Sequence, residues 1–174
     1  ENLKALGVDT IHIETNSNTI EKIRYVDNRS NQLVMRVDKN DLCDRIDQNE
    51  LISFDGYDAI IISDYCKGFL LEEDIQYICE NYDNVFIDTK KKLGKWIKNA
   101  NFIKINDLEH KKNFEVIPVY PTSEVPVKDV SGAGDTFLAG LVFEYVKSGN
   151  IKKAINFAQE CTTKVVQKHG VSTV

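Results

Sequence analysis

The residues with the clearest chemical potential form one octet, Asp129-Val130-Ser131-Gly132-Ala133-Gly134-Asp135-Thr136. Small residues at positions 131–134 let the backbone approach a ligand closely, and the apolar spacing that follows predicts a helix from Ala133. The first amides of a helix have no partner within that helix, and they lie at the positive end of its dipole. The octet therefore predicts a site for a phosphate group or for a developing negative charge.

Asp135 falls in the first turn of that predicted helix, beside the anion site. A carboxylate there can accept a proton from an attacking hydroxyl while the amides neutralise a transferred phosphoryl group. The same pattern fits a purely structural role, in which Asp135 stabilises the helix dipole and the glycines only form a turn. The residue types alone leave both interpretations open.

Polar residues also follow three short apolar runs elsewhere in the chain. The runs lie at 59–62, 85–87 and 102–105, and they lead into Ser63-Asp64-Tyr65, Asp88-Thr89-Lys90 and Asn106-Asp107. Ligands of parallel α/β sheets bind beyond the carboxyl ends of the strands. These groups can therefore hold a sugar or a phosphate, although each can equally cap the helix that follows.

The elements that must position these groups follow from the hydrophobic spacing. Residues 71–82 and 93–100, between the apolar runs, carry the spacing of helices. Two more helices are expected, one at 133–148 closed by Gly149 and one that Asn150 caps and that ends at Gly170. Buried strands alternating with amphipathic helices predict an α/β fold with a mainly parallel sheet. At this length we expect one domain.

Residues 10–38 depart from that alternation. Residues 19–26 and 33–37 read as part-alternating strands on either side of a polar turn at 27–30. This arrangement predicts a hairpin with one exposed face.

Composition excludes several classes of protein. The 174 residues are 42% hydrophobic and 28% charged, as in ordinary globular chains. A net charge of −5 argues against a nucleic-acid-binding face, and no apolar run reaches the ~20 residues of a membrane-spanning helix. Four widely spaced cysteines favour reduced thiols, and the lysines at 90–92 indicate a solvated face or a local anion site. We expect a cytoplasmic protein that binds neither nucleic acid nor membrane.

The octet resembles the signature of the PfkB, or ribokinase-like, carbohydrate kinases, in which a Gly-Ala-Gly-Asp turn opens a helix. Asn106-Asp107-Leu108-Glu109 resembles the Asn-x-x-Glu motif of that family, and Asp88-Thr89-Lys90 resembles its Asp-Pro-Lys with Thr in place of Pro. Residues 63–68, Ser-Asp-Tyr-Cys-Lys-Gly, resemble the Ser-Asp-Tyr-Gly-Lys-Gly of its heptose-phosphate kinase branch. Matches in one order cover residues 19–174.

This resemblance implies a three-layer αβα ribokinase-like fold with a small β lid at residues 10–38 and an α/β core at 58–174. It implies a kinase that transfers the γ-phosphoryl group of ATP to a sugar or sugar-phosphate hydroxyl, with Mg²⁺ as cofactor and K⁺ as a further cation. Within the family, the branch motifs favour D-glycero-D-manno-heptose 7-phosphate as the substrate. Sheet edges left open by missing strands favour association into a homodimer.

The resemblance also implies roles for single residues. Asp135 would be the catalytic base, and the amides of Gly132, Ala133 and Gly134 would form the anion hole. The residues implied on the ATP side are Asn106, Asp107, Leu108 and Glu109 near the phosphates, with Glu109 holding Mg²⁺ through water, and Gln159 near the adenine.

Two further sets complete the implied site. Asp129 and Ser131 match positions that help to hold a monovalent cation. The candidates for the sugar or sugar-phosphate side are Asp64, Lys67, Arg24 and Gln32. Exposed charge on a lid strand or loop explains the last three equally well.

Two features depart from the family. Its members begin with strands that carry a Gly-Gly motif and much of the sugar pocket, whereas this sequence starts at Glu1 and has no Gly-Gly pair. Only five residues separate Glu109 from Glu115, where relatives have further helices and a strand. We expect that the sequence either omits stretches of a longer polypeptide or is a shortened relative lacking the N-terminal strands. The alternatives in function are a kinase for another sugar, such as ribose or fructose, and a non-catalytic nucleotide-binding remnant.

Overall fold

The structure is a computed structural model of the chain, and it describes residues 7–8, 13, 19–30, 32–47, 54–105 and 130–168. The chain divides into two compact units. The first comprises Glu1–Ile52 and Cys66–Leu71, and the second comprises Ser53–Tyr65 and Glu72–Val174.

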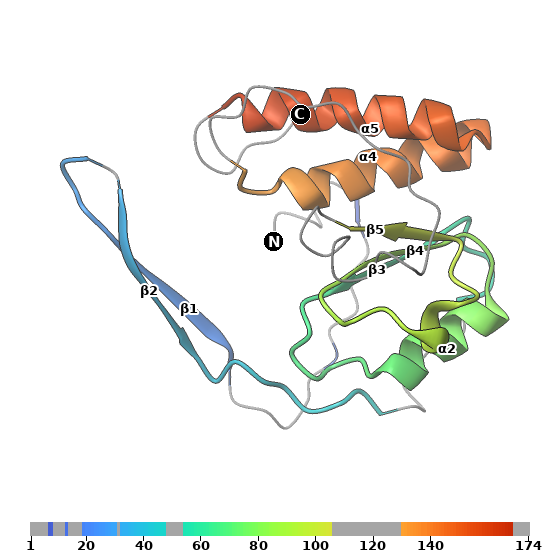
Figure 1. Ribbon diagram of the computed structural model, residues 1–174, viewed down its shortest axis with the longest axis horizontal. Helices are drawn as coiled ribbons and strands as arrows, with labels where there is room; N and C mark the ends of the chain where they lie inside the picture. Colours follow the sequence, from blue (N-terminus) through green and yellow to red (C-terminus); the bar gives the residue numbers. More distant parts are fainter. Residues whose placement is uncertain are drawn as a thin grey trace. The chain divides into compact units, whose positions relative to one another are not determined.

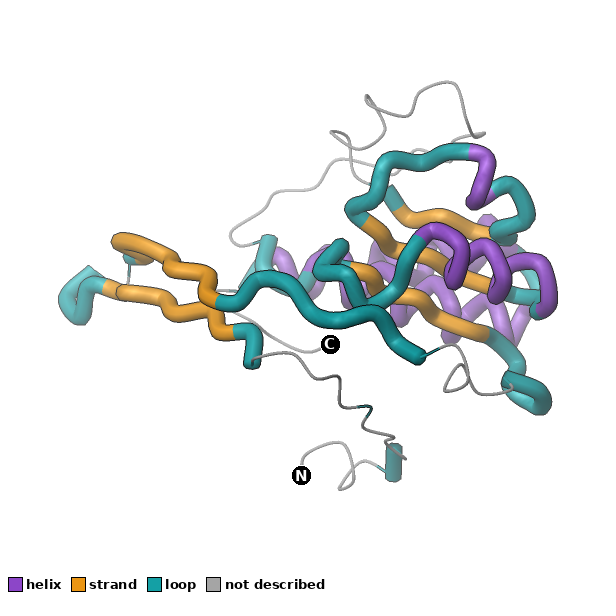
Figure 2. The backbone as a smooth tube through the Cα atoms, turned by 90° about the horizontal axis from the view of Figure 1, so that it is seen from below, coloured by secondary structure: helices purple, strands orange, loops and turns teal. Residues whose placement is uncertain are grey.

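The first unit contains an antiparallel hairpin of β1 (Glu21–Val26) and β2 (Leu33–Lys39), drawn as two orange strands in Figure 2. Directly opposed residues of a sheet share a face. One face of the hairpin therefore carries Lys22 and Arg24 opposite Asp38 and Arg36, and the other face carries Ile23 opposite Val37. The predicted hairpin is confirmed, and the role of residues 10–38 as a lid stays a prediction.

The second unit contains a three-stranded parallel sheet in the order β3-β4-β5. Its strands are β3 (Ile60–Asp64), β4 (Val85–Thr89) and β5 (Phe102–Lys104), and its helices are α2 (Glu72–Asn81), α4 (Ala133–Ser148) and α5 (Ile151–Val166). Figure 1 shows α4 and α5 on one side of this sheet and α2 on the other. The predicted α/β fold with a parallel sheet is confirmed, and the complete three-layer arrangement stays a prediction.

Apolar side chains of α4 pack against the sheet and against α5. One buried cluster joins Phe86 of β4 to Leu138, Leu141 and Val142 of α4 and to Ala154 and Ala158 of α5. Burial of this apolar surface is the main force that holds the helix pair on the sheet. A Cβ placed at Gly140 would lie 3.2 Å from the Cα of Ala158, so glycine at this position lets the two helices approach closely.

The helix ends agree with most of the sequence-based boundaries. Gly149 ends α4 in the left-handed conformation, and the Asn150 side chain accepts hydrogen bonds from the amides of Lys152 and Lys153 as the N-cap of α5. The helix predicted at 93–100 is wrong, because this segment contains only the 3-10 turn η2 (Lys95–Ile97) after an extended Gly94. Burial of Leu93, Trp96 and Ile97 produced the helix-like spacing.

Two expectations from composition can be compared with the described residues. Cys43, Cys66, Cys79 and Cys161 are free thiols, as predicted. None of the described helices is both long enough and apolar enough to cross a membrane.

Candidate functional site

Helix α4 begins at Ala133, as the octet predicted. Gly132 precedes the helix at φ 76, a left-handed conformation that glycine adopts without strain. The Ala133 amide donates to the Val130 carbonyl (3.1 Å) and the Thr136 amide donates to the Gly132 carbonyl (2.9 Å). Within the described part of the chain, the amides of Gly134 and Asp135 donate to no backbone carbonyl. Of the three amides predicted to form the anion hole, that of Ala133 is engaged within the turn. Those of Gly132 and Gly134, like that of Asp135, donate to no backbone carbonyl among the described residues, and their binding role stays a prediction.

Gly134 leaves room for a charged side chain from the sheet. A Cβ at this position would lie only 2.8 Å from Nζ of Lys104, the last residue of β5. That ammonium donates to Asp88 Oδ2 on the neighbouring strand β4 (2.8 Å), and both side chains are less than one-fifth exposed. A cation therefore lies beside the positive end of α4, and the combination favours a negatively charged ligand.

The carboxylate of Asp135 has a partner at the end of β3. The Tyr65 hydroxyl donates to Asp135 Oδ1 at 3.4 Å. Burial, followed by the charge of Asp135, raises the pKa of Tyr65, so the phenol stays protonated at neutral pH and can donate. The Lys90 ammonium lies 5.5 Å from the centre of the Tyr65 ring. Asp135 itself is exposed, as a base that must reach a substrate hydroxyl needs to be.

Asp64, at the end of β3, is a buried carboxylate. Its Oδ2 accepts hydrogen bonds from Lys91 Nζ (2.5 Å) and from Thr89 Oγ1 (2.7 Å), and its side chain is 5% exposed. This carboxylate therefore ties the end of β3 to the end of β4. The interpretation of residues 90–92 as a solvated face is wrong for Lys91, whose side chain is only 10% exposed.

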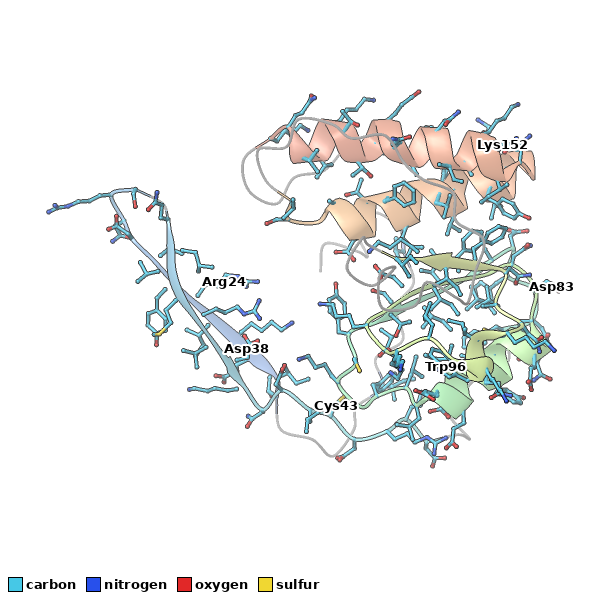
Figure 3. The ribbon with its side chains drawn as sticks, in the orientation of Figure 1. Arg24, Asp38, Cys43, Asp83, Trp96 and Lys152 are labelled. Atoms are coloured by element: carbon cyan, nitrogen blue, oxygen red, sulfur yellow. The ribbon has the colours of Figure 1, made fainter. Side chains whose placement is uncertain are left out.

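The candidates for the sugar-phosphate side other than Asp64 lie in the first unit. Lys67 forms an ion pair with Asp41. Arg24 lies opposite Arg36 on the hairpin, and Figure 3 labels Arg24 and Asp38 on these two strands. Gln32 closes the hairpin turn, because its carbonyl accepts from the Asp27 amide (2.9 Å). The structure brings Arg24 and Lys67 into one unit and leaves their binding role a prediction.

The residues predicted on the nucleotide and cation side are only partly described. Gln159 lies half-buried in α5, and its carbonyl accepts from Thr163 Oγ1 (2.8 Å), while Ser131 lies in the turn before α4. Asn106, Asp107, Leu108, Glu109 and Asp129 lie outside the described residues. In the ranges that are described, no group of three or more His, Cys, Asp or Glu residues could hold a metal ion.

Two charged residues of these sites, Lys104 and Asp41, were not singled out from the sequence, and Lys91 was noted only as one of the lysines at 90–92. Lys104 interrupts an apolar run directly before Asn106, and this position is the one signal that could have identified it. Lys91 stands between two other lysines, and Asp41 stands in a polar stretch, so neither has a distinguishing pattern. Lys91 and Asp41 are identified only by their ion pairs with residues of other segments, Asp64 and Lys67 respectively.

Comparisons with known proteins agree with the motifs. Residues 109–174 match the model of the pfkB family carbohydrate kinases. The chain is 29% identical to the bifunctional protein HldE of a Nitratiruptor species, over 96% of this chain and 46% of that protein. It is 28% identical to the bifunctional protein HldE of Aliarcobacter butzleri, over 97% of this chain and 45% of that protein. These matches confirm the resemblance on which the predicted roles depend.

The matches cover nearly all of this chain but only part of each relative. The chain spans about half the length of the curated relatives it matches. The match with the Nitratiruptor protein runs over 213 residues, whereas this chain has 174, so that protein has segments inside the matched region that this chain lacks.

Proposed function

From the relationship of this chain to the pfkB family carbohydrate kinases, we propose that it carries the chemistry of a sugar kinase, transferring the γ-phosphoryl group of ATP to a sugar or sugar-phosphate hydroxyl. The observation that carries the proposal is the start of α4, where the exposed Asp135 carboxylate lies beside two amides that donate to no backbone carbonyl of the described residues. This is the arrangement that phosphoryl transfer to a hydroxyl requires.

Each group at the start of α4 has a task in this reaction. Asp135 accepts the proton of the attacking hydroxyl, and the Tyr65 hydroxyl holds that carboxylate in place until the substrate arrives. The amides of Gly134 and Asp135 stabilise the negative charge of the transferred group, and the nearby Lys104 ammonium adds to their field. Mg²⁺ supplies neutralisation of the ATP phosphates when it is bound, and Asn106 and Glu109 are the residues proposed to organise it.

Among sugar substrates, we favour D-glycero-D-manno-heptose 7-phosphate. The sequence Ser-Asp-Tyr-Cys-Lys-Gly at 63–68 and the similarity to proteins named HldE support this choice. Cationic residues of the first unit, Lys67 and Arg24, suit the phosphate group of such a substrate.

The test is release of ADP from magnesium-ATP in the presence of potassium, with heptose 7-phosphate, ribose and fructose compared as acceptors. Asp135→Asn is expected to reduce kcat by about 10²- to 10⁴-fold, because it removes the general base and little else. The matched control is Asp83→Asn, an exposed aspartate before β4 at the other end of the strands, which should leave kcat unchanged. Equal turnover in Asp135→Asn and in the unaltered chain would contradict the assignment.

A second candidate function is nucleotide binding without turnover. The segments that this chain lacks within its match to the Nitratiruptor protein favour this alternative, since phosphoryl transfer depends on the positioning of both substrates. Calorimetric binding of ADP by a folded chain that turns over none of the three sugars would select it. Turnover of ribose or fructose in preference to heptose 7-phosphate would instead select a kinase of another branch.

A further inference from the structure

Asp41, in the first unit, is a carboxylate surrounded by cations. Its Oδ2 forms an ion pair with the Lys67 ammonium. Its Oδ1 is buried and has no hydrogen-bond partner within the described part of the chain. The hydrogen bond from Lys67, assisted by the charges of Lys22 and Arg36, lowers the pKa of Asp41. Asp41 is therefore ionised at neutral pH and is the internal counter-ion of this group of cations.

The backbone fixes Lys67 in front of Asp41. The Cys43 amide donates to the Lys67 carbonyl (2.7 Å), and the Ile46 amide donates to the Phe69 carbonyl (3.0 Å). Gly68 between them has φ +103, and a Cβ there would lie 2.5 Å from the Cys43 carbonyl oxygen. Only glycine allows the two segments to approach this closely. The ammonium of Lys67 is thus held near one place, and a single Asp41 oxygen uses only part of its donor capacity.

The adjacent hairpin face carries positive charge that its own carboxylates do not balance. Arg36 is paired with Asp38 through two contacts of 2.9 Å, and Lys22 lies opposite the same Asp38. Arg24 lies directly opposite Arg36 and makes no ion pair within the described ranges. Like charges directly opposed across strands are unfavourable unless an anion joins them. This face of the hairpin therefore carries three cations, Lys22, Arg24 and Arg36, and one carboxylate, Asp38. Within the same unit, Asp41 is the carboxylate that holds the Lys67 ammonium.

We propose that Asp41 is a specificity-determining residue that holds the Lys67 ammonium in the free protein and yields it to the phosphate group of a phosphorylated sugar. This inference rests on the proposed function and deepens it. A phosphate monoester brings nearly two charges and three acceptor oxygens, so it can displace a carboxylate from Lys67. A sugar without phosphate cannot do so. The pair accordingly selects phosphorylated over unphosphorylated acceptors.

The test measures the Kd of inorganic phosphate by calorimetry, without nucleotide, so that its outcome does not depend on kinase activity. Asp41→Asn keeps the side-chain shape and removes the competing charge, and it should tighten phosphate binding about two- to fivefold. Lys67→Met should weaken binding, and Asp41→Asn should have no effect in the Lys67→Met background, because the competition is for Lys67. If phosphate binds at a site away from Lys67, its Kd should be the same in both variants as in the unaltered chain.

The matched control is Glu21→Gln, which makes the same chemical change in the exposed Glu21–Lys39 pair of the hairpin and should leave the Kd unchanged. Weaker or unaltered phosphate binding in Asp41→Asn overturns the proposal, and so does a tightening that persists without Lys67. Absence of saturable phosphate binding in both the unaltered chain and Asp41→Asn also overturns it. Where Lys67→Met fails to fold by circular dichroism, Lys67→Gln replaces it. Failure of the kinase proposal alone would appear as this Kd pattern without turnover of any sugar.

Discussion

The two regions that carry the predicted site use charge in different ways. At the start of α4 and the neighbouring strand ends, ion pairs are largely shielded from water: the Lys91–Asp64 side chains are 10% and 5% exposed, and those of Lys104–Asp88 are 19% and 18% exposed. In the first unit the pairs are more accessible to water: the part-buried Lys67–Asp41 side chains are 26% and 38% exposed, and those of Lys39–Glu21 are 56% and 51% exposed.

This difference separates positioning from recognition. A buried pair is strong only while both partners are present, and it fixes the segments that carry it. An exposed pair contributes little to stability and exchanges partners readily, which suits a group that must release one anion and accept another. The shielded pairs of the second unit therefore hold their groups still, and the more accessible pairs of the first unit suit the exchange of partners that we propose. The effects of substitutions should differ accordingly.

The largest effect on stability is expected from Lys91→Met. This change removes the Lys91 cation from the buried Asp64 carboxylate, and it should lower the free energy of unfolding by about 3 kcal/mol, as measured by urea denaturation. The double variant Asp64→Asn with Lys91→Met removes both charges and should recover part of that loss. A loss below about 1 kcal/mol in Lys91→Met would show that this pair is as weak as the exposed ones, and the contrast between the two regions would disappear.

A smaller, functional effect is expected from Gly134→Ala. The added Cβ would lie 2.8 Å from Lys104 Nζ, so the ammonium must move away from the start of α4. We expect kcat to fall about tenfold while stability holds, since alanine favours the helix over glycine. In a Lys104→Met background the same change should cost little more, because the clash is then absent. Equal losses in both backgrounds would mean that Gly134 acts through the backbone alone and not through Lys104.

Much of the fold could be predicted because its signals are local. The apolar runs at 59–62 and 85–87 become β3 and β4, and the cap at Asn150 begins α5 where the sequence placed it. The prediction of a helix at 93–100 was wrong because it, too, depended on a local signal. Three buried residues with helical spacing cannot distinguish a full helix from one 3-10 turn, and the extended Gly94 decides between them.

The candidate site was predictable where a motif marks it and not where contacts between distant segments decide. Asp135 and its turn follow from eight consecutive residues, and the structure places them at a helix start. The two ion pairs join residues far apart in the sequence: 27 residues separate Asp64 from Lys91, and 26 separate Asp41 from Lys67. No local sequence pattern predicts such pairs. Long-range pairing depends on strand register and segment pairing, which become visible only in the folded chain.

The smallest effect is expected from Glu21→Gln, and it is the most direct test of the exposed region. The pair with Lys39 spans 3.8 Å between two half-exposed side chains, so water and salt screen most of its attraction. Its loss should change the free energy of unfolding by no more than about 0.5 kcal/mol, and by less in 1 M salt. Urea denaturation at low and high salt measures both values. A loss of more than about 1 kcal/mol would mean that the hairpin depends on its exposed charges for folding, in which case those charges would not be available to exchange partners with a ligand.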